Sequence, residues 1–361
     1  MSKAYPPIVY GEYLRLELLL ASQSPKSVEY GQPAHDEMLF IVVHQAYELW
    51  FKQILHELGS VMALFRADSV DERSIGVALS RLTRVVEILK LLTDQLRVLE
   101  TMTPLDFLDF RDMLVPASGF ESVQFRLIER KLGLNPAARV PLERSEATRT
   151  AADAKSLSDA EAEASLFVLV ERWLERTPFL DLPGYQFWQS YRGAVDRMLD
   201  ADRATIEATV TSPEARAAQL AEHSVTRASF DGLFDEAVHA RLVSEGRRRM
   251  SLRATLAALL IHLYRDQPIL HLPFRFLTAL VDIDELFASW RYRHAQMAHR
   301  MIGSKIGTGG TSGHRYLLNT VERHRVFADL DNLSTFLISR RALPELPADV
   351  ERRLGFYYPR D

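Results

Sequence analysis

Cysteine is missing from all 361 residues of the chain. Disulfides, iron–sulfur clusters, thiolate zinc sites and thiolate-ligated haem are therefore excluded. The absence also suits a reducing compartment, and we expect the protein to be cytoplasmic. Any metal chemistry must use carboxylates, a bound cofactor or some of the 11 histidines.

A basic excess and a long apolar run are missing as well. The formal net charge is -4 at pH 7, which argues against a nucleic-acid-binding surface, because such surfaces concentrate Lys and Arg. The apolar stretch 16–21 is interrupted by Glu17 and is far shorter than the ~20 residues that cross a bilayer. We therefore expect a soluble protein that binds neither nucleic acid nor membrane.

Strand patterns are nearly absent too, since no alternating run of apolar and polar residues is bounded by hairpin turns. Helical spacing takes their place. Apolar residues recur at intervals of three and four over residues 39–65, 82–99 and 283–301. Asp36 precedes the first of these helices as its expected N-cap. Stripes of this kind pack helix against helix, so we expect an all-α bundle.

The remaining chain is expected to be largely helical. Pro268 and Pro273 predict a connection, and the polar residues 139–165 predict a weakly helical surface excursion. No internal repeat divides the chain, so we expect one domain over residues 1–361, with a helical insert at about 139–250. Further helices are expected over residues 166–174, 186–211 and 250–264, with a loop at 177–184.

His294 occupies a position on the third apolar stripe where Leu or Met would be expected. One interpretation is an axial haem ligand, because a neutral imidazole from a bundle helix often holds haem iron. Cations near the same helix end, Arg300 among them, would suit the two haem propionates. The other interpretation is a core histidine bonded to the backbone, beside solvated cations at a helix C-terminus. The pattern alone leaves both open.

Two further residues are candidates for binding a small ligand, His44 for a flat aromatic group and Arg111 for a carboxylate. His44 lies one helical turn after Phe40, so the two side chains share a face that could border an aromatic ligand. Arg111 follows Phe107 and Phe110, and an arginine beside aromatic rings suits a bidentate contact with a carboxylate. A packed core histidine and a surface ion pair of Arg111 are the alternatives.

Four glycines fall within the seven residues 307–313, which predicts a mobile loop able to close over a small polar group. The loop is neither a Walker nor a Rossmann motif, because Lys305 precedes the glycines instead of following them. A plain helix-ending turn after Gly303 is the alternative.

Several long motifs occur in one order along most of the chain. They are YGEYL at 10–14, HDEMLF at 35–40, HQAYELWFK at 44–52, LETMTP at 99–104, FLDFRD at 107–112, PASGF at 116–120, WRYRH at 290–294 and GSK at 303–305. Together they resemble the tryptophan 2,3-dioxygenase family, and WLERTP at 173–178 is similar to its longer, animal-type members. The resemblance implies the helical-bundle haem fold of the tryptophan and indoleamine dioxygenases.

Carried over residue by residue, the resemblance implies one haem b per subunit, with His294 as the proximal ligand of its iron. His44 would be the catalytic residue facing the indole N–H. Arg111 and Thr308 would hold the carboxylate and ammonium ends of L-tryptophan. The other implied contacts are Phe40, Phe107 and Gly119 at the indole, Ser118, Gly119 and Arg300 at the haem, and Tyr10, Tyr13 and Leu14 from a neighbouring subunit.

The resemblance also implies a reaction and an assembly. L-tryptophan and O2 would give N-formyl-L-kynurenine, the first step of the kynurenine pathway. The protein would be a homotetramer whose segment of about residues 1–30 is exchanged between subunits. Glu121 stands where the family usually has Gln, and Phe107 matches animal-type members where some bacterial ones have Tyr. The alternatives are a haem monooxygenase of modified tryptophan, a haem carrier or sensor, and a helical interaction protein without a cofactor.

Overall fold

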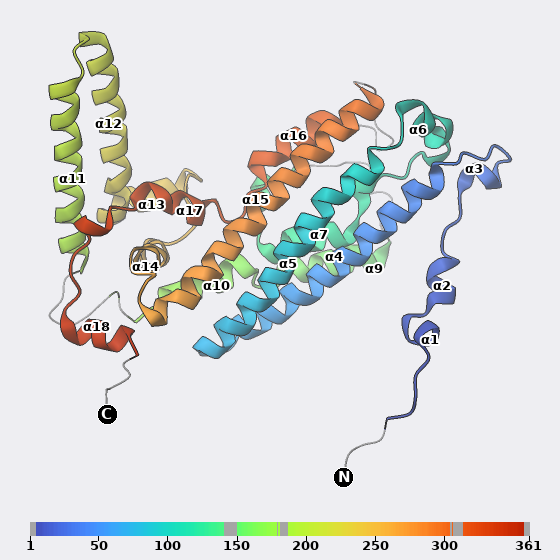
Figure 1. The fold of residues 1–361 in the computed structure, drawn as a ribbon, viewed down its shortest axis with the longest axis horizontal. Helices are drawn as coiled ribbons and strands as arrows, with labels where there is room; N and C mark the ends of the chain where they lie inside the picture. The colour runs from blue at the N-terminus through green and yellow to red at the C-terminus, as the bar shows by residue number, and fades with distance from the viewer. Residues whose placement is uncertain are drawn as a thin grey trace.

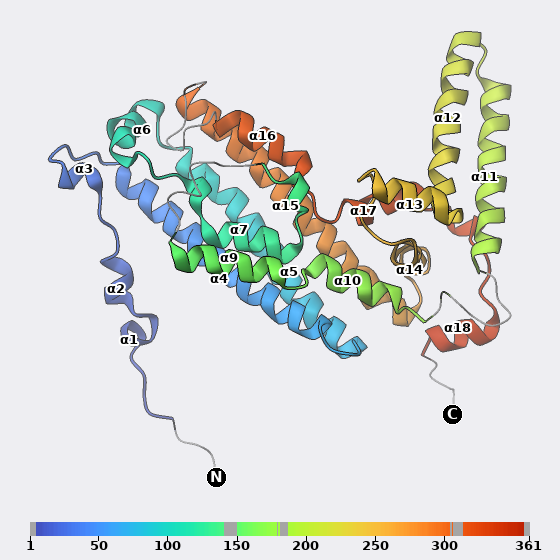
Figure 2. The same ribbon diagram turned by 180° about the vertical axis from the view of Figure 1, so that it is seen from behind.

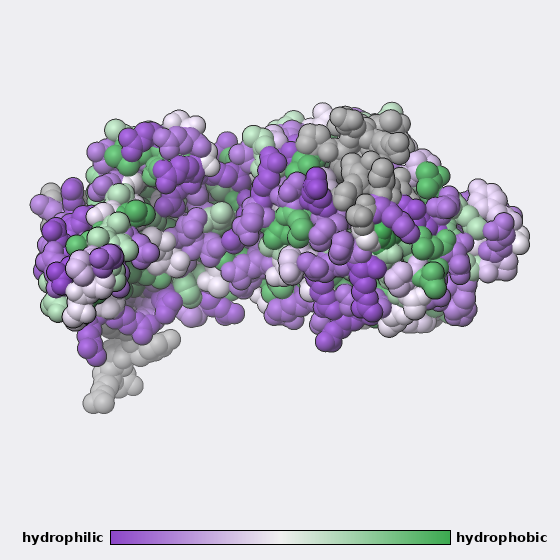
Figure 3. All heavy atoms as spheres, turned by 90° about the horizontal axis from the view of Figure 1, so that it is seen from above, coloured by the Kyte–Doolittle hydropathy of each residue, from purple (hydrophilic) through white to green (hydrophobic). Residues whose placement is uncertain are grey.

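The computed structural model describes residues 5–140, 150–178, 180, 187–303, 305 and 313–356. Every regular element in these ranges is a helix and none is a strand, which confirms the all-α prediction. None of these helices combines the length and the apolar character that a membrane crossing requires. Hydrophilic residues predominate on the face shown in Figure 3, where hydrophobic residues form small, separate patches.

Three long helices form the body of the molecule. They are α4 (Glu37–Phe65), α5 (Glu72–Leu99) and α15 (Pro268–Ile302). Helix α5 packs against both α4 and α15, and the three run side by side (Figure 1). Shorter helices cover this layer (Figure 2). They are α7 (Val123–Leu132) and α10 (Leu166–Glu175) beside α4, α9 (Ala151–Ala162) on α7, and α16 (Gly313–Arg323) on α15.

The core follows the apolar stripes, although the buried face of α4 extends beyond the predicted stripe. All six apolar positions predicted for α5 are buried, from Leu82 to Leu99. On α4 the aromatic residues Tyr47 and Phe51 are buried, whereas Trp50 is only partly covered. Helix α4 packs against α5 and also against α7 and α10, so its buried face is broader than a single stripe.

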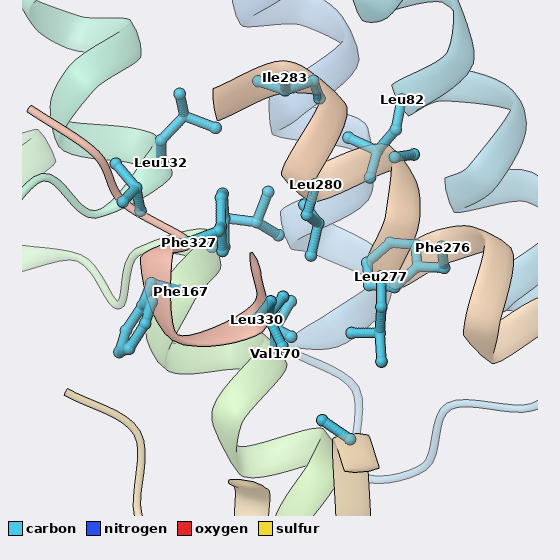
Figure 4. Packing of buried hydrophobic residues seen from close by; sticks show 14 of the residues in the cluster. Leu82, Leu132, Phe167, Val170, Phe276, Leu277, Leu280, Ile283, Phe327 and Leu330 are labelled. Atoms are coloured by element: carbon cyan, nitrogen blue, oxygen red, sulfur yellow. The ribbon is translucent and has the colours of Figure 1, made fainter. Parts of the chain in front are cut away.

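The core extends from the three-helix layer toward the outlying part of the molecule. Figure 4 shows side chains from separate parts of the chain pointing toward one another, Leu280 from α15, Val170 from α10 and Leu330 from α17 (Ala328–Asp331). Asp284 of α15 accepts hydrogen bonds from the backbone N–H groups of Val326 and Phe327 at 2.8 and 3.1 Å. This buried carboxylate fixes the segment before α17 to the long helix.

Helix α15 corrects the expected connection between Pro268 and Pro273. The helix begins at Pro268 and continues through Pro273. Proline is favourable at the first helical position, because its missing N–H would have no intrahelical partner there. At Pro273 the helix loses only the hydrogen bond to the carbonyl four residues earlier. Two prolines near a helix start therefore do not end the helix.

Helix starts show how the local sequence places the elements. Asp71 caps α5 by accepting the N–H of Ser74 at 2.7 Å. Asp36 does occupy the N-cap position of α4, but its side chain accepts no capping hydrogen bond. Thr103 and Asp106 form a reciprocal capping box at the start of α6 (Pro104–Arg111). This box sets the start of the short helix that carries Phe107 and Arg111.

The predicted helical insert, at about 139–250, contains more helices than its sequence pattern indicated. The expected helices at 166–174, 186–211 and 250–264 are present as α10, α11 (Phe187–Thr209) and α14 (Leu252–Leu263). Helices α12 (Pro213–Phe234) and α13 (Glu236–Ser244) were not predicted. Helices α11 and α12 pair as a hairpin that stands away from the three-helix layer (Figure 1). The remaining short helices are η1 (Asp112–Leu114), η2 (Gly119–Glu121), η3 (Pro136–Ala138), η4 (Asn332–Phe336), η5 (Arg340–Ala342) and α18 (Ala348–Leu354).

The N-terminal segment lies apart from the body. It contains α1 (Tyr10–Leu14), α2 (Leu16–Leu20) and α3 (Lys26–Glu29), and both ribbon views show α1 and α2 separated from α4 (Figures 1 and 2). Neither α1 nor α2 has a buried residue. Tyr10 and Tyr13 are 73% and 70% exposed. So many exposed apolar side chains on one segment indicate a surface that another molecule covers.

Candidate active site

A cavity of about 240 Å³ lies among α4, α5, α6, α7, α15 and α16. Its lining brings together seven of the residues predicted from the sequence, which come from four separate stretches of the chain. They are Phe40, His44, Phe107, Arg111, Ser118, Gly119 and His294. Most of the other lining side chains are aliphatic or aromatic, and a mainly apolar cavity with a few polar groups is typical of a small-molecule site.

One part of the lining is an aromatic slot. Phe40 lies 5.8 Å from Phe107 between ring centroids, with the rings inclined by 30°. Phe110 is buried behind them, with its centroid 5.6 Å from Phe40 and 5.4 Å from Phe107. The ring of His44 lies 4.1 Å from that of Phe40. Flat apolar walls beside one imidazole suit a planar aromatic ligand with a single polar group.

His44 has a defined tautomer. Its Nδ1 lies 2.7 Å from the carbonyl oxygen of Phe40, and since that oxygen can only accept, Nδ1 carries the hydrogen. Burial lowers the pKa of His44, against the opposing effects of the Phe40 carbonyl and Glu48. The neutral ring therefore has its lone pair on Nε2. A Cβ built on Gly119 would lie 3.9 Å from this nitrogen, so the absent side chain keeps the space beside it open.

His294 is a neutral imidazole in the cavity wall. It lies on α15 with its ring centroid 5.2 Å from that of Trp290 and 6.5 Å from that of Phe120. Its Nδ1 is buried and has no hydrogen-bond partner among the described residues. Burial, with a smaller effect of His44, lowers the pKa of His294 to about 4. The alternative of a core histidine bonded to the backbone is therefore not what these residues show.

The donor set fits a metal that arrives inside a flat organic cofactor better than a bare ion. A bare metal ion needs three or more protein ligands, and the described ranges contain no cluster of that kind. The cavity wall instead holds two neutral imidazoles, His44 and His294, and an imidazole in this state is a metal ligand. Haem needs one such axial ligand and apolar walls around its ring.

Arg111 ends α6 and lines the cavity with Phe107. Its side chain is 15% exposed, and its Nη1 lies 3.3 Å from Asp112 Oδ1. The ion pair expected as an alternative is thus present, but Asp112 is 87% exposed. Such a pair contributes little, because water screens the carboxylate. The guanidinium remains suited to a carboxylate inside the cavity.

The other predicted residues are less closely gathered. Ser118 caps η2 and accepts the N–H of Phe120 at 3.4 Å, next to Gly119. Arg300 is exposed on the last turn of α15 and does not belong to the cavity lining. Tyr10, Tyr13 and Leu14 lie on the exposed segment described above and do not line the cavity. Thr308 and the rest of the glycine loop up to 312 lie outside the described residues.

Sequence reasoning missed a buried charged cluster in the same lining. Glu129 Oε2 lies 2.7 Å from Arg126 Nη1, and Glu129 Oε1 lies 2.9 Å from Arg291 Nη2 and 3.0 Å from His324 Nδ1. Burial alone would raise the pKa of Glu129, but Arg126, His324 and Arg291 hold it well below its usual range. One signal was available, since Glu129 interrupts the buried face formed by Phe125, Ile128 and Leu132.

Comparison with known proteins gives one consistent family. The model of the family described as tryptophan 2,3-dioxygenase matches residues 2–337. A tryptophan 2,3-dioxygenase of Bdellovibrio bacteriovorus is 52% identical, over 98% of this chain and 99% of its own length. The enzymes of the same name from Dictyostelium discoideum and Xenopus tropicalis are each 47% identical, over 97% and 96% of this chain and 88% and 86% of their own.

The state of His294 predicts how stability depends on pH. Its pKa is lowered from 6.5 to about 4, so the unfolded chain takes up the proton first as the pH falls. The free energy of unfolding should therefore fall as the pH drops from about 6.5 to 4, and should be unaffected by this group above that range. Guanidinium titrations of the ligand-free protein between pH ~7 and ~5 measure the slope.

The variant His294→Leu removes the titrating ring and should flatten the pH dependence. The control His299→Leu, at an exposed position of the same helix, should keep the wild-type slope. Parallel pH curves for wild type and His294→Leu would show that no neutral imidazole is held at this position.

Proposed function

The chain belongs to the tryptophan 2,3-dioxygenase family, and on that premise we propose that it oxidises L-tryptophan with O2 to N-formyl-L-kynurenine, the first step of tryptophan degradation. One observation carries the proposal. His294, an unprotonated imidazole with an unpartnered Nδ1, lines the same aromatic cavity as His44 and Arg111. A metal ligand, a hydrogen-bond acceptor and a carboxylate partner thus surround one space of ligand size.

The proposed cofactor is haem b, one per subunit, with His294 as the axial ligand of its iron. When bound, haem supplies the iron that binds and activates O2. Ser118 and Gly119 are proposed to border the ring. The small number of side-chain donors and the mainly apolar lining support this choice. Arg300 was predicted to contact the cofactor, but its exposed position gives that role no support.

The substrate is proposed to lie with its indole against Phe40 and Phe107, which line the same side of the cavity. His44 Nε2 is the acceptor nitrogen of its ring, because Nδ1–H is donated to Phe40, and it would accept the indole N–H. It positions the indole and does not take its proton, since indole is far too weak an acid to lose a proton readily near pH 7. Fixing the ring in one place is the main contribution of these walls to the rate.

The amino-acid end of the substrate is proposed to meet Arg111 through its carboxylate. The guanidinium is largely covered by α6 and the cavity wall, where a charge-assisted pair is stronger than in water. Thr308 is proposed for the ammonium group, at a position outside the described residues. A substrate without a carboxylate would not make this charge-assisted contact, which disfavours its binding relative to L-tryptophan.

The N-terminal segment is proposed to complete the site of a neighbouring subunit in a homotetramer, through Tyr10, Tyr13 and Leu14. The supporting observation is that α1 and α2 bury no residue within their own chain, although they carry a run of apolar side chains. A cytoplasmic location remains a prediction from the sequence.

The proposed reaction is tested by its product. The protein is loaded with haem, reduced without oxygen, and then given L-tryptophan and isotopically labelled O2. We expect N-formylkynurenine absorbance and a product that contains both labelled oxygen atoms. One labelled atom would indicate a monooxygenase, and unchanged tryptophan with a haem Soret band would indicate a carrier or sensor.

Arg111→Ala should retain haem but lose most tryptophan binding. Removing one partner of a covered, hydrogen-bonded charge pair costs about 2–5 kcal/mol, or roughly 30- to 5000-fold in affinity. Titration of the ferrous protein with L-tryptophan and with tryptamine measures the loss. Wild type should prefer tryptophan and the variant should not. Arg97→Ala, at an exposed position of α5, is the control; an equal preference in wild type and Arg111→Ala would refute the assignment.

His294→Ala should lose its haem, because no other axial donor is assigned on its side of the cavity. Gel filtration after loading, followed by the ratio of Soret to protein absorbance, measures the haem retained. His299→Ala, on the same helix but outside the cavity lining, should retain wild-type haem. A normal five-coordinate ferrous spectrum in His294→Ala would remove His294 from the site.

A further inference from the structure

Five residues form a buried polar wall of the cavity that the proposed reaction leaves without a role. Arg126 and Glu129 come from α7, Arg291 from α15 and Tyr316 from α16, and His324 directly follows α16. Tyr316 and His324 are 7% and 3% exposed, and Arg291 is 4% exposed. Charged and polar side chains are seldom buried together in this number unless each has a partner.

Three atoms of the polar wall lack such a partner. Tyr316 Oη, Arg126 Nε and His324 Nε2 are all buried and make no hydrogen bond of good geometry within the described part of the chain, although Tyr316 and Arg126 lie close enough to interact with each other. Leaving one such group unsatisfied disfavours the folded state by about 1–3 kcal/mol. Three on one cavity wall indicate that the cavity receives a polar group at this place.

The charge of the lining gives the sign of that group. The polar wall holds two arginines, Arg126 and Arg291, and one glutamate, Glu129, which leaves one positive charge in excess. Glu129 binds one Nη atom of each arginine, and Nε–H of Arg126 is a buried donor beyond these contacts. A positive excess with free donors favours an anion.

The position of the polar wall identifies the anion. The ring of Tyr316 packs on Phe120 with centroids 4.8 Å apart, and Phe120 lies 6.5 Å from His294. The wall therefore adjoins the proposed iron ligand, whereas Arg111 and the aromatic slot serve the substrate. Haem carries two propionates on one edge of its ring, so a carboxylate site is needed beside the axial ligand.

We propose that the polar wall binds a propionate of the haem, with the hydroxyl of Tyr316 and Nε–H of Arg126 as donors. The proposal rests on the proposed function, since it needs haem in the cavity. Glu129 acts as a positioning residue, because it fixes both arginines and the ring of His324. In this proposal, residues of α7 and α16 make the contact with the propionates that the sequence predicted for Arg300.

The test compares two cofactors in the loaded protein. The dimethyl ester of haem carries both propionates as neutral methyl esters, so it presents no anion to such a site. We expect Tyr316→Phe to release haem about tenfold faster than wild type, because one hydrogen bond to a charged acceptor is lost. Release of the ester should be the same in both. Transfer of the cofactor to excess apomyoglobin, followed by absorbance, measures each rate.

Tyr292→Phe is the matched control, because Tyr292 is 52% exposed on α15 and lies outside the cavity lining. It should release both cofactors at wild-type rates. Equal acceleration of haem and ester in Tyr316→Phe would show that the hydroxyl acts through packing and would overturn the proposal. So would unchanged haem release in a protein that binds haem and forms N-formylkynurenine. Failure of the wild type to bind haem would instead overturn the proposed function, and this inference with it.

Discussion

The candidate site depends on the burial of one imidazole, that of His294. His294 stays neutral because burial disfavours its charged form, and a neutral ring is the form that binds iron. The burial comes from α15, whose neighbouring residues Ile283 and Phe287 belong to the core while Met297 and Met301 line or border the cavity. One helix thus packs the molecule together and presents His294 to the cavity, so the geometry of the candidate site depends on the core.

Much of the site was predictable because its residues lie on helices with strong periodicity. Phe40 and His44 are four apart on α4, and helical geometry alone places them on one face. His294 was conspicuous because it replaces an apolar residue on a regular stripe. That His44, Arg111 and His294 share one cavity could not follow from periodicity, which says nothing about how helices are arranged. The family resemblance supplied that expectation, and the cavity lining is consistent with it.

The misses have physical causes. The polar wall joins residues from α7, α15 and α16 that are almost two hundred positions apart in the chain, as in the bond between His324 and Glu129. Local patterns cannot detect such pairs. The connection predicted at Pro268 and Pro273 was wrong because the rule that proline ends a helix applies to the helix interior. Proline is tolerated better in the first turns. The hairpin of α11 and α12 was only half recognised because α12 has few buried residues and therefore a weak apolar stripe.

The two sides of the cavity lie on helices that differ in how many of their side chains are buried in the core. The side of His294 belongs to the long helix α15, whereas Arg111 stands on α6, eight residues long with Phe110 as its one buried side chain. Residues of a short helix with few buried side chains can be substituted without disturbing the packing of the three long helices. Substitutions that accumulate in the family should accordingly change which amino acid is bound well before they change the reaction that it undergoes.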